Sequence, residues 1–232
     1  MTPQSVPVLH YTKQPLLEPN RYAAVLSSCG RPRRAGRAAK DRRIKCVIVG
    51  DKAVGKTSLA VSYSNDCFPS EYVPTAYDNY NVEVQVNGKP VRVELCDTTG
   101  EDELNPLRNL CYPGADVFML CFSVVKPSSF ISACTRWADE LARHAVPVVL
   151  VGTQADLACN QEALGRLKRS GQRPVSPAEA RGLAERLDAP YVETSALACT
   201  QLKEAFDTAI LVALRRQERT GNRWRRLFCC LG

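Results

Sequence analysis

Eight residues near position 50 have the types and spacing of a loop that binds nucleotide phosphates. Residues 44–49 are mostly apolar and β-branched, which favours a buried strand, and the residues after the loop favour a helix. The pattern between them is G-x-x-x-x-G-K-[ST], whose glycines let successive N–H groups point at phosphate oxygens. A chance glycine loop is the alternative, but it would not require the flanking strand and helix. The matching residues are Gly50, Asp51, Lys52, Ala53, Val54, Gly55, Lys56 and Thr57, with Ser58 following in the helix.

Each part of this loop has a chemical task. Lys56 would bring positive charge to the β- and γ-phosphates, and the Thr57 hydroxyl can be a ligand of Mg²⁺. The unpaired amides and the dipole at the start of the following helix favour an anion. The stretch therefore predicts a nucleoside-triphosphate site.

Three later stretches bear on which base is bound. Asp97-Thr98-Thr99-Gly100 ends a strand and offers a carboxylate for Mg²⁺, through water, and a Gly100 N–H for the γ-phosphate. The Asp156 carboxylate can accept from the N1–H and the 2-amino group of guanine, a donor pair that adenine lacks. Backbone amides after the next strand could reach the guanine O6. The residues predicted to form the base site are Thr153, Gln154 and Asp156, with Ser195, Ala196 and Leu197.

Apolar runs and amphipathic segments alternate along residues 43–216. This alternation predicts an α/β fold with six strands in a mostly parallel sheet and helices on both faces. The exception is a pair of alternating runs around Asn87-Gly88, which predicts a hairpin and one antiparallel edge strand. We further expect a short polar helix at 160–169, a strand at Tyr191–Glu193 and a closing helix at Leu202–Arg216.

Composition and charge divide the chain into three parts. We expect a disordered, proline-containing extension at 1–40, a globular domain at 41–216 and a basic tail at 217–232. The net charge of +7 lies in the flanks, with eight basic residues against one acidic residue at 31–45 and six arginines against one glutamate at 215–226. Nucleic acid and an anionic membrane surface are both possible partners of such segments. Cys46, Cys96 and Cys121 lie in apolar runs and are expected to be buried free thiols.

These motifs together resemble a known family. From about Arg43 to Arg216 the chain resembles a Ras-superfamily small GTPase of the Rho family, which implies a P-loop NTPase fold of the Ras-like G-domain type with GTP, GDP and Mg²⁺ as cofactors. The stretches that carry the resemblance are GDKAVGKT, YVPTAYDNY, DTTGEDE, TQAD and ETSAL, in order. The helix at 160–169 resembles the Rho insert. The TQAD variant, the N-terminal extension and the WRRLFCC tail resemble most closely the atypical Wrch/Chp branch.

The resemblance also implies roles for individual residues. Phe68 would stack on the guanine, Thr75 would close over Mg²⁺, and Thr75, Lys56 and Glu101 would lie at the reacting phosphate. A membrane-anchored switch of this kind would act on the actin cytoskeleton and cell morphology. Its partners would be effector kinases with Cdc42/Rac-binding segments, exchange factors and GTPase-activating proteins. The implied effector surface comprises Tyr72, Ala76, Tyr77, Asp78, Asn79 and Tyr80.

Three positions depart from the family pattern. Glu101 occupies the position of the glutamine that orients the attacking water, and a carboxylate would repel the γ-phosphate. Lys52 replaces a glycine where a side chain crowds an incoming arginine, and Thr99 replaces an alanine. We expect slow hydrolysis that activating proteins stimulate poorly. The alternatives are tolerated substitutions with ordinary hydrolysis, and a scaffold that binds GTP without turning it over.

The end of the chain favours a membrane over nucleic acid. Six arginines lead into Trp224, Phe228, Cys229 and Cys230, and the terminal glycine is not a usual residue for prenylation. Palmitoylation at Cys229 and Cys230, as the resemblance implies, would combine with the basic charge on anionic lipids to give two anchoring signals. We expect the protein at the cytoplasmic face of the plasma membrane or on endosomal membranes. An inert charged tail is the alternative.

Overall fold

The computed structural model describes residues 9–10, 42–69, 77–101 and 103–229, with the backbone alone at 9–10 and 221–229. Within these residues the predicted α/β fold is confirmed. Seven strands form one sheet in the order β1-β3-β4-β2-β5-β6-β7. Strands β4, β2, β5, β6 and β7 are parallel to one another, whereas β3 is antiparallel to β4.

The six predicted strands are β2 to β7, and each lies where its apolar run predicts it. They are β2 (Arg42–Val49), β3 (Tyr77–Val86), β4 (Lys89–Thr98), β5 (Val117–Ser123), β6 (Val148–Thr153) and β7 (Tyr191–Glu193). The β3–β4 hairpin turns at Asn87 and Gly88, both with positive φ (52° and 71°). That geometry is the one that favours an Asn-Gly pair in a two-residue turn.

Strand β1 was not predicted. Leu9–His10 pairs antiparallel with β3, opposite Val86 and Gln85, so β3 is not the edge strand over this length. These two residues lie in the extension that we expected to be disordered, and the rest of that extension lies outside the described residues. A two-residue strand has no periodicity that a sequence pattern could reveal.

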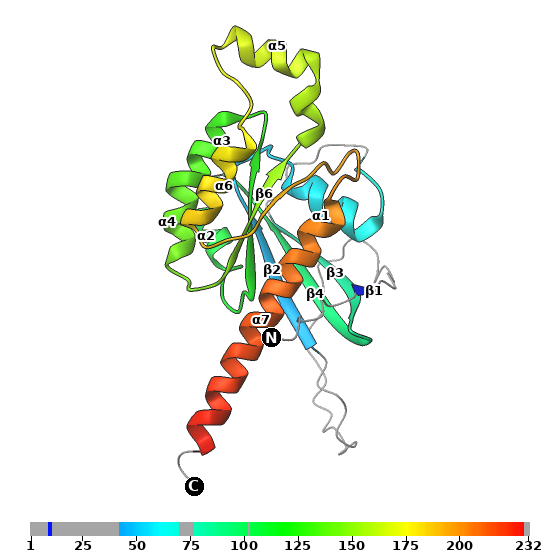
Figure 1. Cartoon of the computed structure of the whole chain (residues 1–232), viewed down its shortest axis with the longest axis vertical. Coiled ribbons are helices and arrows are strands. Elements are labelled where there is room, and N and C mark those ends of the chain that lie inside the picture. The colour runs from blue at the N-terminus through cyan, green and yellow to red at the C-terminus, as the bar shows by residue number, and fades with distance from the viewer. Residues whose placement is uncertain (1–8, 11–41, 70–76, 102, 230–232) are drawn as a thin grey trace, which may run out of the picture.

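Helices cover both faces of the sheet (Figure 1). One face carries α1 (Lys56–Asn65) and α7 (Leu202–Cys229), which pack with the sheet in one apolar cluster. The opposite face carries a second cluster, to which Trp137 and Leu183 belong. Its helices are α2 (Asn105–Asn109), α3 (Pro127–Ser132), the π-helical turn η1 (Ala133–Trp137), α4 (Ala138–Ala142) and α6 (Pro177–Arg186).

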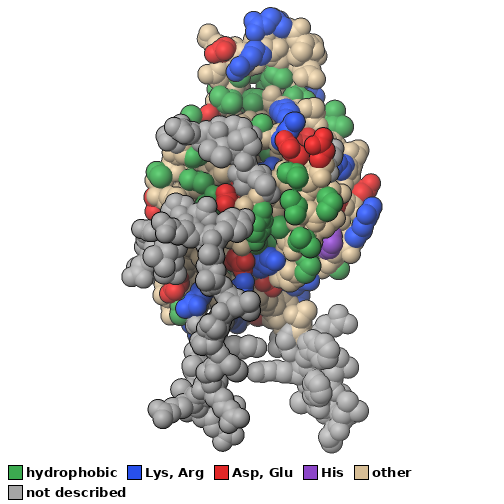
Figure 2. Space-filling model, turned by 180° about the vertical axis from the view of Figure 1, so that it is seen from behind, with side chains coloured by type: hydrophobic (Ala, Val, Ile, Leu, Met, Phe, Trp, Pro, Cys, Tyr) green, Lys and Arg blue, Asp and Glu red, His purple; other side chains and the backbone are tan. Residues whose placement is uncertain are grey.

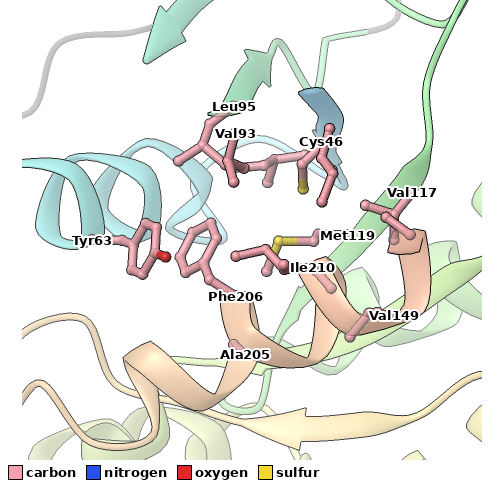
Figure 3. Close-up of a cluster of buried hydrophobic side chains, with 14 of the residues drawn as sticks. Cys46, Tyr63, Val93, Leu95, Val117, Met119, Val149, Ala205, Phe206 and Ile210 are labelled. Carbon is pink, nitrogen blue, oxygen red and sulfur yellow. The ribbon is translucent and has the colours of Figure 1, made fainter. Parts of the chain in front are cut away.

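The cluster under α1 and α7 fixes the end of β2 beside α1. Tyr63 of α1 stacks on Phe206 of α7 with ring centroids 3.9 Å apart, next to Met119 and Ile210 (Figure 3). Cys46, Cys96 and Cys121 are buried in β2, β4 and β5, as predicted. Burial raises the pKa of Cys121 to about 12, so this thiol stays protonated and packs as a small apolar side chain.

The predicted polar helix is α5 (Gln161–Arg169), which projects from the sheet above α3 (Figure 1). Asn160 caps it by accepting from the Ala163 N–H at 3.0 Å. Lys and Arg side chains gather on this projection, among them Arg166, Lys168 and Arg169 (Figure 2). The 3₁₀ turn η2 (Ala155–Cys159) joins it to β6.

Helix α7 is longer than predicted. We expected it to end at Arg216, and it continues to Cys229. Arg216 Nη1 donates to Ala115 O at 3.0 Å and Gln217 Nε2 donates to Asp116 Oδ1 at 3.0 Å, so the helix is still held by the domain at the expected end. The following residues are mostly good helix formers without proline, and Gly221 alone does not stop a helix. None of the described helices combines the length and the apolar character that crossing a bilayer requires.

Asp207 of α7 lowers the stability of the folded state by an amount that depends on pH. Its side chain is 20% exposed, and burial raises its pKa to about 6 although Lys203 Nζ lies 3.8 Å away. Because the unfolded carboxyl ionises at lower pH, the folded state loses stability as pH rises from about 4 to about 6 and remains less stable above that range. We expect Asp207→Asn to raise the free energy of unfolding by about 1–2 kcal/mol at neutral pH.

Urea unfolding of wild type and variant at two pH values checks this. The gain should be full at about pH 7.5 and fall to less than about half of that near pH 4.5, where the folded carboxyl is protonated. Asp139→Asn changes an exposed aspartate on α4 and is the control. It should leave the free energy of unfolding unchanged at both pH values. A gain of the same size at both pH values would contradict the account.

Candidate nucleotide-binding site

The predicted phosphate loop joins β2 to α1, and its backbone requires glycine at its start. Gly50 has φ 139°, and a Cβ there would lie 2.1 Å from Cys121 O of β5. Gly55 has φ 92° and Ala53 has φ 59°. This left-handed backbone turns the loop back on itself before the first amides of α1.

Lys56 lies inside this loop. Its side chain is buried, and Nζ donates to Gly50 O and Asp51 O, both at 2.9 Å. Burial lowers its pKa, while the nearby Asp97 opposes the shift. The ammonium is therefore held at the loop by carbonyl oxygens, where an anion enclosed by the same loop would contact it.

Asp97 and Thr57 form the candidate divalent-cation site. Thr57 Oγ1 donates to Asp97 Oδ2 at 2.5 Å, whereas Asp97 Oδ1 is buried and accepts no hydrogen bond from the residues that the structure describes. Burial raises the pKa of Asp97 to about 6, and the Thr57 hydroxyl partly offsets the shift. A buried carboxylate oxygen without a donor, beside a hydroxyl, fits the oxygen ligands that Mg²⁺ prefers.

A cavity of about 140 Å³ lies beyond the loop. It brings together stretches that are far apart in the sequence, as predicted. Its apolar walls and single carboxylate fit a planar base with a donor edge. The lining residues are Gly55, Ser58, Leu59, Phe68, Thr153, Gln154, Asp156, Leu157, Ala196 and Leu197.

Asp156 is held on the wall of this cavity. Ser195 Oγ donates to Asp156 Oδ1 at 2.6 Å and accepts from the Ala198 N–H at 3.0 Å. One serine thus joins the carboxylate to the backbone of the loop after β7. The bond to Ser195 uses one of the several acceptor positions that a carboxylate offers.

Gln154 and Thr153 join the cavity to the phosphate loop. Gln154 has φ 59°, its Oε1 accepts from Ser123 Oγ at 2.5 Å, and its side chain lies near Gly55. The Thr153 hydroxyl lies 2.9 Å from Phe122 O and also contacts Val54 O. Base site and phosphate site are therefore parts of one hydrogen-bonded unit.

The loop after β4 lies against the phosphate loop. A Cβ on Gly100 would lie 2.2 Å from Lys52 N and 2.3 Å from Asp51 C, so the two backbones are in direct contact. Thr99 Oγ1 accepts from the Glu101 N–H at 3.1 Å. Glu101 therefore lies at the rim of the phosphate loop, and its role at the reacting phosphate stays a prediction.

Comparison with known proteins agrees with this geometry. The pattern of the Ras family matches residues 45–215. This chain belongs to the Ras family. Its curated relatives place it in the Rho-related branch. It is 46% identical over 211 residues to the Rho-related GTP-binding protein RhoV of Bos taurus, covering 84% of this chain and 89% of that protein. It is 47% identical over 203 residues to RhoV of Homo sapiens, covering 80% and 86%. The predicted resemblance to the atypical Rho branch is confirmed.

The structure of this Rho-family GTPase adds a buried network that the sequence did not reveal. Arg108 of α2 donates to Glu140 through Nε and Nη2, both at 3.1 Å, and to Glu101 O through Nη1 at 3.2 Å. Its guanidinium lies over the Trp137 ring, 4.6 Å from the centroid. Trp137 Nε1 in turn donates to Asp51 Oδ1 at 2.8 Å. This network joins the phosphate loop to the loop after β4 and to the α3–α4 segment.

The predicted effector surface is described only in part. Tyr77, Asp78 and Asn79 are exposed at the start of β3, and Tyr80 is half-buried. Asn79 Nδ2 donates to Tyr77 OH, which fixes the exposed ring along the strand. Tyr72, Thr75 and Ala76, together with Cys230, lie outside the described residues, and for Cys229 the backbone alone is described. Their roles stay predictions.

Asp156→Asn tests the assignment of the base site. The amide would present a donor where a carboxylate accepts, so it cannot accept two N–H groups of guanine and should instead suit the 2-oxo group of xanthine. Loss of two charge-assisted hydrogen bonds predicts a GDP affinity lower by roughly 10²- to 10³-fold and a gain for xanthosine diphosphate.

Displacement of a fluorescent nucleotide measures both affinities. Asp188→Asn, an exposed aspartate outside the cavity, should leave them unchanged. An Asp156→Asn variant that keeps full GDP affinity would show that the base binds elsewhere.

Proposed function

We propose that this Rho-family GTPase is a membrane-anchored GTP switch with impaired hydrolysis. The observation that supports binding of a guanine nucleotide is the position of Asp156. It lies in a cavity that continues from the phosphate loop and is lined by most of the residues predicted for the base site, Ser195 excepted. An acceptor carboxylate at that place selects guanine over adenine, because adenine has no matching pair of donors.

Two loops at the phosphate end would report whether GTP or GDP is bound. Asp97 and Thr57 would hold Mg²⁺, with Thr75 as the predicted third ligand, and Gly100 would contribute its N–H to the γ-phosphate. Loops held by these contacts order with GTP and are released after hydrolysis. Bound Mg²⁺ would supply positive charge that neutralises the phosphates, while Lys56 supplies it from the protein.

Hydrolysis would be slow because of the side chains at the rim of the site. Glu101 cannot donate a hydrogen bond when ionised, and it lies beside a phosphate loop that already carries Lys52. The Lys52 side chain is exposed, and it would crowd the path by which an activating protein inserts an arginine. The protein would then remain mainly GTP-bound, under the control of abundance, exchange and location.

A non-hydrolysing scaffold is the second candidate, and the same two side chains favour it. Such a protein would bind GTP, recruit partners through the exposed start of β3 and never release phosphate. The two candidates differ in single-turnover GTP hydrolysis. A slow switch has a measurable rate, and a non-hydrolysing scaffold has none.

Replacing both rim residues should restore ordinary behaviour. Lys52→Gly opens the path for an arginine, and Glu101→Gln supplies a neutral side chain that can orient water. We expect the double variant to show stimulation of single-turnover GTP hydrolysis by a Rho-type activating protein of roughly a hundredfold or more, against little stimulation of the wild type.

Phosphate release measured with and without the activating protein gives both rates. Lys89→Gly, at an exposed site in the β3–β4 hairpin, controls for the loss of a surface charge. Brisk stimulation of the wild type, or no gain in the double variant, would contradict slow hydrolysis by this cause.

We infer that partners bind at the exposed start of β3. Its aromatic and polar side chains suit an effector kinase that adds a Cdc42/Rac-binding segment to the sheet, since no other described strand pairs with the outer edge of β3 there. Exchange factors and activating proteins would act on the adjoining loops. Signalling to the actin cytoskeleton and cell morphology follows from this choice of effectors.

The C-terminal part of α7 would carry the membrane anchor. Arg215, Arg216 and Arg219 begin a basic stretch that leads to Cys229 at the end of the helix. Palmitoylation of Cys229 and Cys230 with basic charge on anionic lipids would give two signals for stable binding. The expected location is the cytoplasmic face of the plasma membrane or endosomal membranes.

Changing Cys229 and Cys230 together to serine tests the anchor. Without acyl chains the basic segment alone should bind weakly, so the membrane fraction should fall roughly tenfold. Sedimentation of cell membranes, followed by blotting, measures the distribution. Cys159→Ser, an exposed cysteine after β6, is the matched control. A double variant that remains on membranes would show that acylation is not the anchor.

A further inference from the structure

Two residues that depart from the family pattern face each other. Lys52 Nζ of the phosphate loop lies 4.0 Å from Glu101 Oε1 of the loop after β4. Their side chains are 70% and 46% exposed, so the pair lies at the rim of the site and not in its interior. The sequence provides a separate reason why each residue should slow hydrolysis. It did not predict that the two side chains form an ion pair.

The backbones beneath the pair are fixed. Glu101 N–H donates to Thr99 Oγ1 at 3.1 Å, and Glu101 O accepts from Arg108 Nη1 at 3.2 Å. On the other side, Lys52 O accepts from Lys126 Nζ at 3.1 Å. Because Gly100 already touches the Lys52 backbone, the two charged side chains start from anchored positions and need only local rotations to meet.

Such a pair is easily broken. Exposed ion pairs change an equilibrium by only about 1.5- to 5-fold, because water screens both charges and ordering two long side chains costs entropy. A γ-phosphate carries more charge than a carboxylate, and the phosphate loop that bears Lys52 is built to enclose it. Such an anion would attract Lys52 away from Glu101 and repel Glu101 as well.

We propose that the Lys52–Glu101 ion pair is a latch that forms when no γ-phosphate is bound and opens when GTP binds. The pair thereby lowers the preference of the protein for GTP over GDP. Lys52 is the residue that determines this preference, and Glu101 sets its strength by competing for the same ammonium. The inference rests on the proposed nucleotide site and concerns binding, independently of the rate of hydrolysis.

A double-mutant cycle on nucleotide affinity tests the latch. Wild type, Glu101→Gln, Lys52→Gly and the double variant are titrated with GDP and with a non-hydrolysable GTP analogue, in Mg²⁺, by displacement of a fluorescent GDP. Glu101→Gln should raise the ratio of GTP-analogue to GDP affinity about three- to tenfold, because it removes both the competing partner and the repulsion. Lys52→Gly should lower this ratio. In the Lys52→Gly background the Glu101→Gln gain should shrink at least about twofold, since repulsion alone remains.

Salt and a neighbouring residue provide the controls. The difference between the two backgrounds should fade between about 0.05 M and 0.5 M salt, as expected for an exposed pair. Glu103→Gln removes the same charge two residues away, and it should leave the ratio unchanged. An equal gain from Glu101→Gln in both backgrounds, or a shift of the same size from Glu103→Gln, would overturn the latch. A protein that binds neither nucleotide would instead overturn the proposed function.

Discussion

The whole site depends on backbone segments that touch without side chains between them. Gly50 lies against the carbonyl of Cys121, and Gly100 lies against the backbone of Asp51 and Lys52. Any larger residue at either position would separate β2 from β5, or the loop after β4 from the phosphate loop. Because the two loops touch, a displacement of one loop must displace the other. The same contact allows two residues from separate loops to meet at the rim.

The buried network extends this contact into the domain. Arg108 holds the carbonyl of Glu101, pairs with Glu140 and lies over Trp137, whose indole binds Asp51. Movement of the loop after β4 therefore disturbs a buried guanidinium, and leaving such a group without its partners is costly. The phosphate loop is thus supported from the side opposite to α1 by charged and aromatic groups, whereas α1 and α7 support it by apolar packing.

Local patterns were predictable from the sequence, and long-range partners were not. The phosphate loop and the Asn87-Gly88 turn each depend on a few adjacent residues, and each lies where predicted. The partner of Asp51 is Trp137, which lies 86 positions away in the sequence, and no local pattern joins the two residues. Lys52 and Glu101 were singled out separately, since nothing in their spacing places them together. The last turns of α7 were missed because the apolar pattern stops where its polar contacts with the domain begin.

The nucleotide carried by the protein tests the central claim most directly. Protein isolated rapidly from cells would be denatured, and the released guanine nucleotides would be separated and quantified. Slow hydrolysis at a site that carries Lys52 and Glu101 predicts mostly GTP. Mostly GDP would contradict the account and would indicate an ordinary switch in which these two substitutions are tolerated.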